Sequence, residues 1–268
     1  SKTKSILITF DPHPRHVLQA DYKIPMLMHI NRKLDFIKSF NLDAVLVIPF
    51  NKDFSKVSAY DFLNDIILKH LNAKKIIVGY DHHFGHNREG SPEYLKKLSK
   101  DKDYDLEIVE PIKDREMIIS STHIRESIKK GFVRRASFEL GWVFGFEAKV
   151  VPGSGRGKGL GFPTANFLPI EKNQLIPANG VYFIRGRINS INLYGMCNLG
   201  TRPTFDEIDF VMEVHFFKGT VNDIYGKTIT VEFLERVRDE KKFSSPKELI
   251  KQLEKDKEIC MRLIQKYN

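Results

Sequence analysis

The sequence predicts two domains, an α/β domain followed by an antiparallel β-barrel. The chain has 268 residues, which exceeds the usual size of one compact core. In its first half, short β-branched runs alternate with helix-like segments, a pattern typical of a parallel sheet covered by helices on both faces. From Glu147 onward, short alternating strands are separated by Gly, Asn and Pro turns, which indicates an antiparallel barrel. We expect the two domains to span residues 1–140 and 141–268.

The elements of the first half follow from hydrophobic periodicity and from capping residues. Ser58 and Ser91 are expected N-caps, and Ser121 is expected to start a helix that ends at Gly131. The predicted strands are 5–9, 44–48, 75–78 and 106–109, and the predicted helices are 27–40, 59–71, one from residue 92 and one from residue 121. In such sheets ligands bind beyond the carboxyl ends of the strands. The loops at 10–14, 79–90 and 120–125 are therefore candidate binding loops.

The second half has four clear strand patterns and a final helix. The strands are predicted at 181–184, 193–199, 211–217 and 228–234. The capping box Ser245-Pro-Lys-Glu248 announces the helix, which should pack on the barrel through one apolar stripe. The stripe consists of Leu249, Ile250, Leu253, Cys260, Leu263 and Ile264.

Composition restricts the class of protein. Apolar residues make up 41% and charged residues 29% of the chain, as in soluble globular proteins. The net charge of +9 is spread over both halves without a basic stripe, so anionic small ligands explain it as well as nucleic acid does. We expect small-molecule partners, with no nucleic acid and no membrane; the sequence leaves the oligomeric state open.

The longest clean apolar run near the start, Ala44 to Phe50, is too short to cross a bilayer, and no signal-type cleavage site follows Ser1. Cys197 and Cys260 have neither metal-binding nor redox spacing, which indicates two structural thiols in a reducing compartment. A cytoplasmic location is expected.

The strongest chemical signal is the stretch from Gly153 to Asn166, where five glycines and two basic residues run into a Pro-Thr-x-Asn tetrad. Such glycines allow positive φ and close approach to an anion, so that backbone N–H groups and the charges of Arg156 and Lys158 can converge on phosphate. Neither a P-loop nor a dinucleotide fingerprint is present. Thr164 and Asn166 share one face of an extended segment, where their oxygens suit a magnesium ion that bridges ATP phosphates. A flexible turn between two strands is the alternative.

Two further motifs carry candidate chemistry. Ser121 and Thr122 place hydroxyls and N–H groups at a helix start, with Arg125 one turn on, which suits a phosphate; an ordinary capped helix with a solvated arginine is the alternative. Glu213 interrupts an apolar strand, so it either faces solvent or is retained for chemistry. The segment 238–243 is either a charged turn or a substrate clamp.

Over essentially its whole length the sequence resembles the bacterial bifunctional riboflavin kinase/FMN adenylyltransferases, also called FAD synthetases. The resemblance rests on an ordered set of motifs. These are Thr-Phe-Asp-Pro-His-Pro at 9–14, Gly-x-Asp-x-x-Phe-Gly at 79–85, Ser-Ser-Thr-x-Ile-Arg at 120–125, Gly-Phe-Pro-Thr-Ala-Asn at 161–166, Pro-Ala-x-Gly-Val-Tyr at 177–182, Asn-x-Gly-x-Arg-Pro-Thr at 198–204, Glu-Val-His at 213–215 and Arg-Asp-Glu-Lys-Lys-Phe at 238–243. It implies a Rossmann-like nucleotidylyltransferase domain and a six-stranded riboflavin kinase barrel with a C-terminal helix.

The resemblance also implies substrates and residue roles. ATP, riboflavin, FMN and FAD would be substrates and products, with magnesium as cofactor. Glu213 would be the catalytic base for the riboflavin 5′-hydroxyl. Thr164 and Asn166 would bind magnesium. The implied ATP-binding residues are Gly153, Arg156, Lys158, Gly159, Thr164 and Asn166 in the kinase, and Ser121, Thr122 and Arg125 in the adenylyltransferase. The implied flavin-binding residues are Pro12, Pro14, Asp81, Phe84, Arg238 and Phe243.

The chain departs from the family at its front. The family begins with a strand that leads into a His-x-Gly-His helix start, whereas this numbering begins at what would be the second strand. His83-Phe-Gly-His86 matches the letters but follows the third strand, so we interpret it as a coincidence. Either the expected segment precedes Ser1, or the adenylyltransferase half is defective. Two alternatives stay open, a monofunctional riboflavin kinase and a non-catalytic flavin- or RNA-binding barrel.

Overall fold

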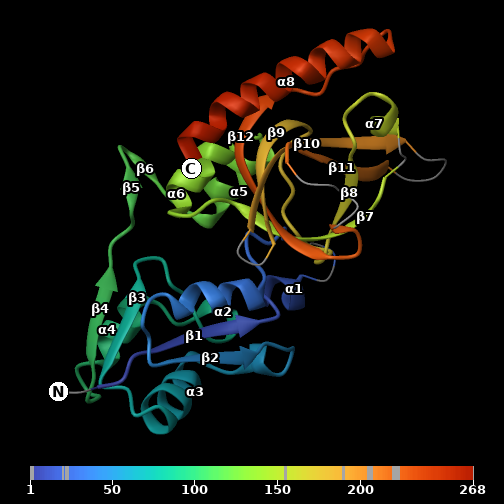
Figure 1. Ribbon diagram of the computed structural model, residues 1–268. Coiled ribbons are helices and arrows are strands. Elements are labelled where there is room, and N and C mark those ends of the chain that lie inside the picture. Colours follow the sequence, from blue (N-terminus) through green and yellow to red (C-terminus); the bar gives the residue numbers. More distant parts are fainter. Residues whose placement is uncertain are drawn as a thin grey trace. The chain divides into compact units, whose positions relative to one another are not determined.

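The computed structural model describes residues 3–19, 21, 24–153, 156–188, 191–203, 208–218 and 224–267 (Figure 1). The chain forms two compact units, one of residues 1–24 and 29–119 and one of residues 25–28 and 120–268. Helices α5 (Ser121–Lys129) and α6 (Val133–Leu140) belong to the second unit, because they pack on each other and α6 packs on strand β12 (Thr228–Arg238). The units thus divide near residue 120, and the domain boundary at residue 140 stays a prediction.

The first unit contains the four expected parallel strands. Strand β1 (Ile6–Asp11) pairs with β2 (Ala44–Pro49), and β3 (Lys75–Gly79) pairs with β4 (Asp105–Val109), both in parallel. Within the described residues these are two separate pairs rather than one sheet. The expectation that both faces are covered is wrong for part of the second pair, because Ile77 is 59% and Val109 46% exposed.

The helices of the first unit are α1 (Pro14–Leu18), α2 (Ile30–Lys38), α3 (Ala59–Asp61) continued by the π-helix η2 (Phe62–His70), and α4 (Pro92–Leu98). Short elements complete it: η1 (Phe54–Lys56), η3 (His86–Arg88), β5 (Lys113–Asp114) and β6 (Met117–Ile118). The side chains of Ser58 and Ser91 cap α3 and α4, as predicted. Helix α2 is shorter than predicted, because His29 has an extended backbone.

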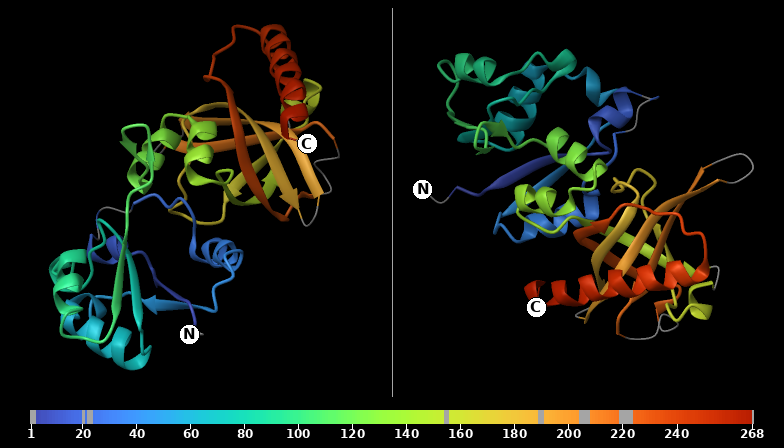
Figure 2. Two further views of the ribbon diagram at one scale, coloured as in Figure 1. Left: turned by 90° about the vertical axis from the view of Figure 1, so that its left-hand side faces the viewer. Right: turned by 90° about the horizontal axis from the view of Figure 1, so that it is seen from above.

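The second unit is built on a closed six-stranded barrel with the strand order β10-β11-β8-β7-β12-β9 (Figures 1 and 2). The other five strands are β7 (Gly145–Pro152), β8 (Ala165–Pro169), β9 (Gly180–Ile188), β10 (Ile191–Pro203) and β11 (Ile208–Phe216). Every pairing in the barrel is antiparallel, so the predicted barrel is confirmed. A short helix, α7 (Arg156–Gly159), lies between β7 and β8.

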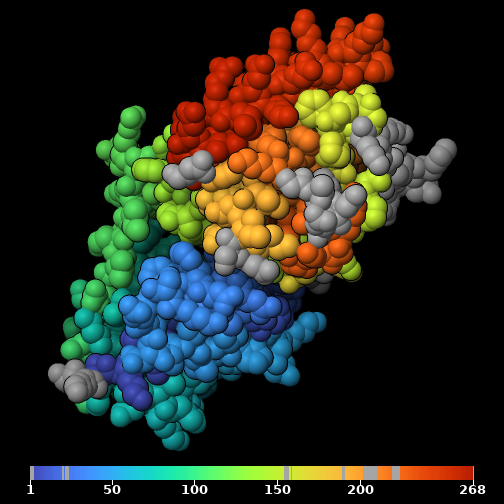
Figure 3. Space-filling model, viewed as in Figure 1, coloured from blue at the N-terminus to red at the C-terminus, as the bar shows by residue number. Residues whose placement is uncertain are grey.

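Helix α8 (Pro246–Tyr267) lies along the outer face of the barrel (Figures 2 and 3). Cys260 and Leu253 of the predicted stripe pack with Val181 and Met196 of the barrel strands. Ser245 caps the helix by accepting the N–H of Glu248, whereas the Glu248 carboxylate accepts the N–H and O–H of the preceding Ser244. The capping box is therefore present with its return bond shifted by one residue.

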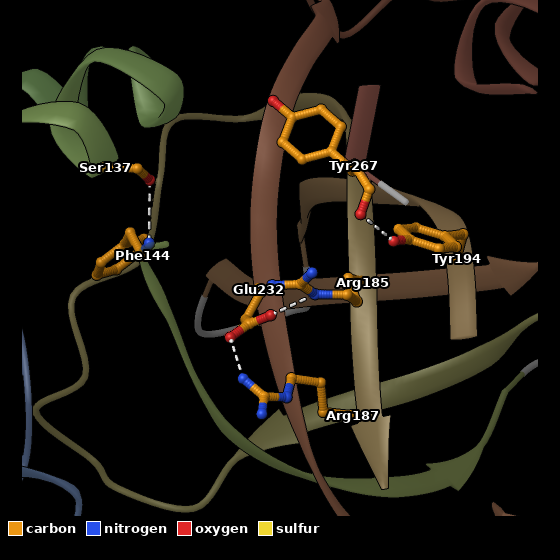
Figure 4. Close-up of polar contacts among 7 residues, drawn as sticks. All are labelled: Ser137, Phe144, Arg185, Arg187, Tyr194, Glu232 and Tyr267. Carbon is orange, nitrogen blue, oxygen red and sulfur yellow. Dashed lines mark hydrogen bonds and ion pairs between the residues drawn. The ribbon is translucent and has the colours of Figure 1, made fainter. Parts of the chain in front are cut away.

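Polar contacts tie barrel strands to one another and to α8 (Figure 4). Glu232, buried at 4% exposure on β12, accepts hydrogen bonds from Arg185 at 2.7 Å and Arg187 at 3.2 Å, both on β9. The hydroxyl of Tyr194 donates to the backbone carbonyl of Tyr267 at 2.8 Å, which fixes the end of α8 to β10. The second unit is thus crosslinked by hydrogen bonds as well as by its apolar core.

Both cysteines are buried free thiols. Burial raises the pKa of Cys260 to about 12, and it raises the pKa of Cys197 as well. Because the thiolate is the reactive form, these side chains serve packing. No helix in the described parts of the chain combines the length and apolar character that crossing a membrane requires.

Candidate active site

The barrel register places Glu213 between two polar side chains, in a row that crosses the strands. On β11, Glu213 lies opposite Asn166 of β8 and Asn198 of β10. Asn198 lies opposite Val181 of β9, and Val181 lies opposite Arg238 of β12. Residues directly opposite each other in antiparallel strands point to the same face of the sheet. Because Val181 packs beneath α8, the row lies on the outer face of the barrel.

The glycine loop lies against the two candidate metal ligands. Thr164 directly precedes β8, two residues before Asn166. A β-carbon placed on Gly157 would lie 3.1 Å from Thr164 Oγ1, and one placed on Gly153 would lie 3.8 Å from Asn166 Oδ1. Glycine backbone and side-chain oxygens are therefore neighbours, as a site for a metal-bound phosphate requires.

The side-chain oxygen of Asn166 tests whether a metal fits. Oδ1 is buried, and it has no hydrogen-bond partner among the described residues. Buried polar atoms are normally satisfied, so this oxygen is a candidate ligand for a group from outside the chain. Amide and hydroxyl oxygens are hard donors of the kind that magnesium prefers. Asn166 and Thr164 thus fit a magnesium ion.

The loop glycines act mainly through close approach. Among those described, Gly161 has a positive φ of +80°, whereas the expectation of positive φ is wrong for Gly153, Gly157 and Gly159. A β-carbon on Gly157 would lie 2.2 Å from the carbonyl oxygen of Phe162, so only glycine fits there. Open space surrounds the corresponding position on Gly159.

Two basic residues of the loop can be placed only by their backbone. Arg156 and Lys158 lie in α7, and their side chains fall outside the described parts of the structure. Their contact with ATP phosphates stays a prediction.

Arg238, a predicted flavin residue, binds a buried carboxylate. Its guanidinium donates to both oxygens of Asp256 of α8 at 2.8 to 3.0 Å, and Asp256 is fully buried. Gln252 donates a further hydrogen bond to Asp256. The Arg238 guanidinium also lies 5.8 Å from the centre of the Phe243 ring, the other predicted flavin residue of this segment. Arg238 therefore holds β12 and α8 together, and its contact with flavin stays a prediction.

The segment after Arg238 lies close to Asn198, the residue opposite Glu213 in the barrel. The carboxylate of Glu240 lies over Gly200 of β10, where a β-carbon would be 2.7 Å from Glu240 Oε1 and 3.7 Å from Asn198 Nδ2. Any side chain at residue 200 would therefore displace Glu240. The close approach places the predicted substrate clamp beside Asn198, the neighbour of Glu213.

The predicted phosphate site of the adenylyltransferase lies at the start of α5. Ser120 caps the helix by accepting the N–H of His123, and Ser121 and Thr122 are exposed in the first turn. Arg125 Nε donates to the carbonyl of Pro25 at 2.8 Å, so part of this guanidinium holds residues 25–28. The hydroxyls and first-turn N–H groups are presented as a phosphate would need them.

Four predicted flavin residues belong to the first unit. Pro14 is the first residue of α1, directly after the Pro12-His13 step, and Asp81 is exposed in the loop after β3. Phe84 packs on Phe62 and over Gly90, inside the core of this unit. Phe84 therefore helps to anchor the loop after β3 to the core of the first unit. The predicted phosphate-binding residues of α5 belong to the other unit. That they form one adenylyltransferase site with the predicted flavin residues stays a prediction.

His83 and His86 do not start an α-helix. Gly85 precedes the three-residue 3₁₀ helix η3, and His86 Nδ1–H donates to the carbonyl of Ser55 at 3.0 Å. This local binding agrees with the interpretation that the His-Phe-Gly-His letters are a coincidence.

Comparisons with known proteins assign the chain to a family. The riboflavin kinase family model matches residues 140–264, and the FAD synthetase family model matches residues 1–123. A bifunctional riboflavin kinase/FMN adenylyltransferase from Buchnera aphidicola of Acyrthosiphon pisum is 33% identical over 270 residues, which cover 99% of this chain and 84% of the relative. The chain belongs to the bifunctional riboflavin kinase/FMN adenylyltransferase family.

Other members support the assignment. The enzyme of this name from Bacillus subtilis is 32% identical, over 96% of this chain and 81% of the relative. The enzyme of this name from Escherichia coli K12 is also 32% identical, over 94% of this chain and 80% of the relative. A crystal structure titled as a macrolide-efflux protein from Streptococcus pneumoniae has a TM-score of 0.86 at 31% identity, covering 96% of this chain and 83% of that one. The predicted family and fold are thus confirmed.

Three residues of this region receive no individual role from the sequence, although Asn198 lies in a family motif and Glu240 in the predicted clamp 238–243. Asn198 stands beside Glu213, Glu240 beside Asn198, and Asp256 beneath Arg238. Pairing the strand at 193–199 with the strand at 211–217 in register would have identified Asn198, because their polar residues then meet on one face. No sequence signal marks Asp256 as the partner of Arg238, since the ion pair forms between distant elements.

Proposed function

We propose that the second unit transfers the γ-phosphoryl group of ATP to the 5′-hydroxyl of riboflavin, which gives FMN and ADP. The proposal is that α5 and the loops of the first unit then transfer the adenylyl group of a second ATP to FMN, which gives FAD and pyrophosphate. Membership of the family supports both activities. The observation that carries the kinase assignment is Glu213 beside Asn166, whose buried oxygen lacks a partner among the described atoms.

In the proposed kinase reaction, Glu213 takes the proton from the riboflavin hydroxyl as that oxygen attacks the γ-phosphorus. A half-buried carboxylate in a row of polar residues is suited to this role, whereas a solvated surface glutamate would have no such neighbours. Phosphoryl transfer depends mainly on positioning and charge neutralisation.

Thr164 and Asn166 would hold magnesium, which neutralises charge on the ATP phosphates when bound. The backbone of the glycine loop, with Gly153 and Gly159, would bind those phosphates, and Arg156 and Lys158 would add positive charge. Arg238 and Phe243 would border the flavin. The proximity of Gly153 to the Asn166 side chain and of Gly157 to the Thr164 hydroxyl supports this arrangement.

In the proposed adenylyl transfer, an oxygen of the FMN phosphate attacks the α-phosphorus of ATP and pyrophosphate leaves. Ser121, Thr122 and Arg125 would stabilise the charge that develops on the phosphates. Asp81 and Phe84, with Pro12 and Pro14, would line the nucleotide or flavin pocket of the first unit.

A monofunctional kinase and a non-catalytic flavin- or RNA-binding protein are not favoured, because both enzyme families match the chain. We infer that the partners are small molecules and that the enzyme works in the cytoplasm.

Replacing Glu213 with Gln tests the kinase assignment. We expect FMN formation to fall by at least ~100-fold, because a lost general base costs about 10²- to 10⁴-fold. Riboflavin affinity, measured by quenching of flavin fluorescence, should stay within a factor of about two, because only the proton acceptor changes. Glu147→Gln, an exposed position on β7, is the matched control and should retain activity. Turnover of Glu213→Gln within tenfold of wild type would sink the proposed role.

A further inference from the structure

His215 occupies a buried position next to the proposed kinase site. It follows Glu213 by two residues on β11, so both side chains emerge on the same face of the strand. The imidazole is only 7% exposed, and its Nδ1 lies 2.9 Å from the backbone carbonyl oxygen of Pro163. Because a carbonyl only accepts, Nδ1 carries the proton. Pro163 directly precedes Thr164.

The imidazole ring is held from several sides. It meets the ring of Phe162 edge-on at 5.2 Å and the ring of Phe217 at 5.9 Å between centroids. The ammonium group of Lys257 on α8 lies 6.0 Å from the centre of the Phe162 ring. Phe162 also belongs to the apolar cluster that includes Cys260 of α8. The orientation of His215 is therefore fixed by packing against both the barrel and α8.

The backbone ladder alone does not hold Thr164. The described pairs between β8 and β11 are Asn166 with Glu213 and Ala165 with Val214, and the ladder stops there. Beyond the Ala165–Val214 pair, the side chain of His215 donates a hydrogen bond to the carbonyl of Pro163. This bond lies where the next backbone pair of the ladder would be expected. On the same segment, the N–H of Phe162 donates to the carbonyl of Gly157 at 2.9 Å. The segment before Thr164 thus connects His215 to the glycine loop.

We propose that His215 is a positioning residue of the kinase, which holds the Pro163–Thr164 backbone so that the Thr164 hydroxyl and the glycine loop meet magnesium-bound ATP. The inference rests on the proposed function of Thr164. Gly157, close to both the Phe162 carbonyl and Thr164 Oγ1, would shift with the segment if the bond were lost.

Two variants separate the hydrogen bond from packing. His215→Phe keeps an aromatic ring but removes the donor, whereas His215→Asn places an amide N–H near the position of Nδ1. We expect His215→Phe to weaken binding of magnesium-ATP by roughly three- to tenfold, the usual worth of one net hydrogen bond. The Kd of magnesium-ATP by calorimetry and the KM for ATP should rise together, while riboflavin affinity stays unchanged. His215→Asn should restore most of the loss.

The outcomes are distinguishable from failure of the proposed function. Equal magnesium-ATP affinity in wild type and both variants would overturn the positioning role, even if Glu213→Gln abolishes kinase turnover. Equal losses in both variants would also overturn it, because packing rather than the donor would then matter. If wild type lacks riboflavin kinase turnover, the proposed function fails, while the calorimetric comparison of Phe with Asn still decides the role of His215 in binding.

Discussion

The side-chain oxygen of Asn166 links the fold to the chemistry at the scale of single residues. A chain that folds without an external ligand normally pairs its buried oxygens internally. Asn166 instead combines an unpaired buried Oδ1 among the described atoms with a position opposite Glu213, beside the close-packed glycine backbone. We therefore propose that this amide serves ligand binding rather than stability.

Removing this oxygen should weaken the use of magnesium. Asn166→Ala is expected to raise the magnesium concentration that half-saturates FMN formation, with partial recovery of turnover at high magnesium, because one hard oxygen ligand is lost. Thr164→Ala should act in the same direction. The exposed Asn192 of β10 provides the control, and Asn192→Ala should titrate like wild type. A magnesium titration of initial rates decides: curves for Asn166→Ala and Thr164→Ala that coincide with wild type would leave the tetrad as a strand connection only.

The sequence identifies candidate site residues more readily than it predicts which residues lie next to them in the fold. Thr164, Asn166 and Glu213 stand out because polar groups interrupt apolar or glycine-rich segments. The positions of Asn198 and His215 beside the proposed site depend on barrel register and on where the β8–β11 ladder stops, and neither is encoded in local periodicity. The partner of Arg238 could not be predicted for the same reason.

At the scale of elements, the Arg238–Asp256 pair joins β12 to α8. Asp256 is fully buried, and the guanidinium supplies both charge and three hydrogen bonds. A buried carboxylate without its partner is strongly unfavourable. A loss of kinase activity on changing Arg238 would therefore reflect the loss of stability, together with the loss of a flavin contact only if the predicted contact exists, so the two effects need separate measurement.

A second-site change separates them. Arg238→Met should lower the free energy of unfolding of the second unit by about 3 to 5 kcal/mol, the usual result of breaking a buried ion pair from one side. The double variant Arg238→Met with Asp256→Leu should recover most of that stability, because no buried charge is left unpaired. If Arg238 also contacts flavin, the double variant should still bind riboflavin weakly; full recovery of affinity would assign Arg238 to structure alone.

The exposed pair Glu258–Arg262 on the same helix is the control for this comparison. Glu258→Gln should change the free energy of unfolding by less than about 1 kcal/mol, because surface ion pairs contribute little. Chemical denaturation monitored by circular dichroism measures all of these variants.

The element order could largely be predicted, whereas the packing of α5 and α6 could not. Strand and helix positions follow from short-range periodicity and capping serines, and these predictions hold in both halves. The association of α5 and α6 with the second unit depends on tertiary packing of α6 against β12. Such packing leaves no mark on local patterns, and the helices continue an α/β alternation that points to the first domain.

At the scale of the whole molecule, the proposed activities use separate residues. The kinase row lies on the barrel, and the adenylyltransferase is assigned to α5 and to loops of the first unit. The product of the first reaction, FMN, is the substrate of the second, yet no residue is assigned to both sites. The two activities should therefore respond independently to substitution.

This independence gives the final prediction. Ser121→Ala combined with Thr122→Ala removes two exposed hydroxyls from the start of α5, while Ser120 still caps the helix. We expect the conversion of supplied FMN and ATP to FAD to fall by about 100-fold, within the range for lost donors to a developing oxyanion. Riboflavin phosphorylation should stay within about twofold of wild type. Arg125→Ala is a less specific test, because Arg125 also binds the Pro25 carbonyl.

Glu213→Gln provides the reciprocal case, with FMN formation lost and FAD formation from supplied FMN retained. Chromatographic measurement of FMN and FAD from each substrate separates the outcomes, and a parallel fall of both activities in either variant would contradict separate sites.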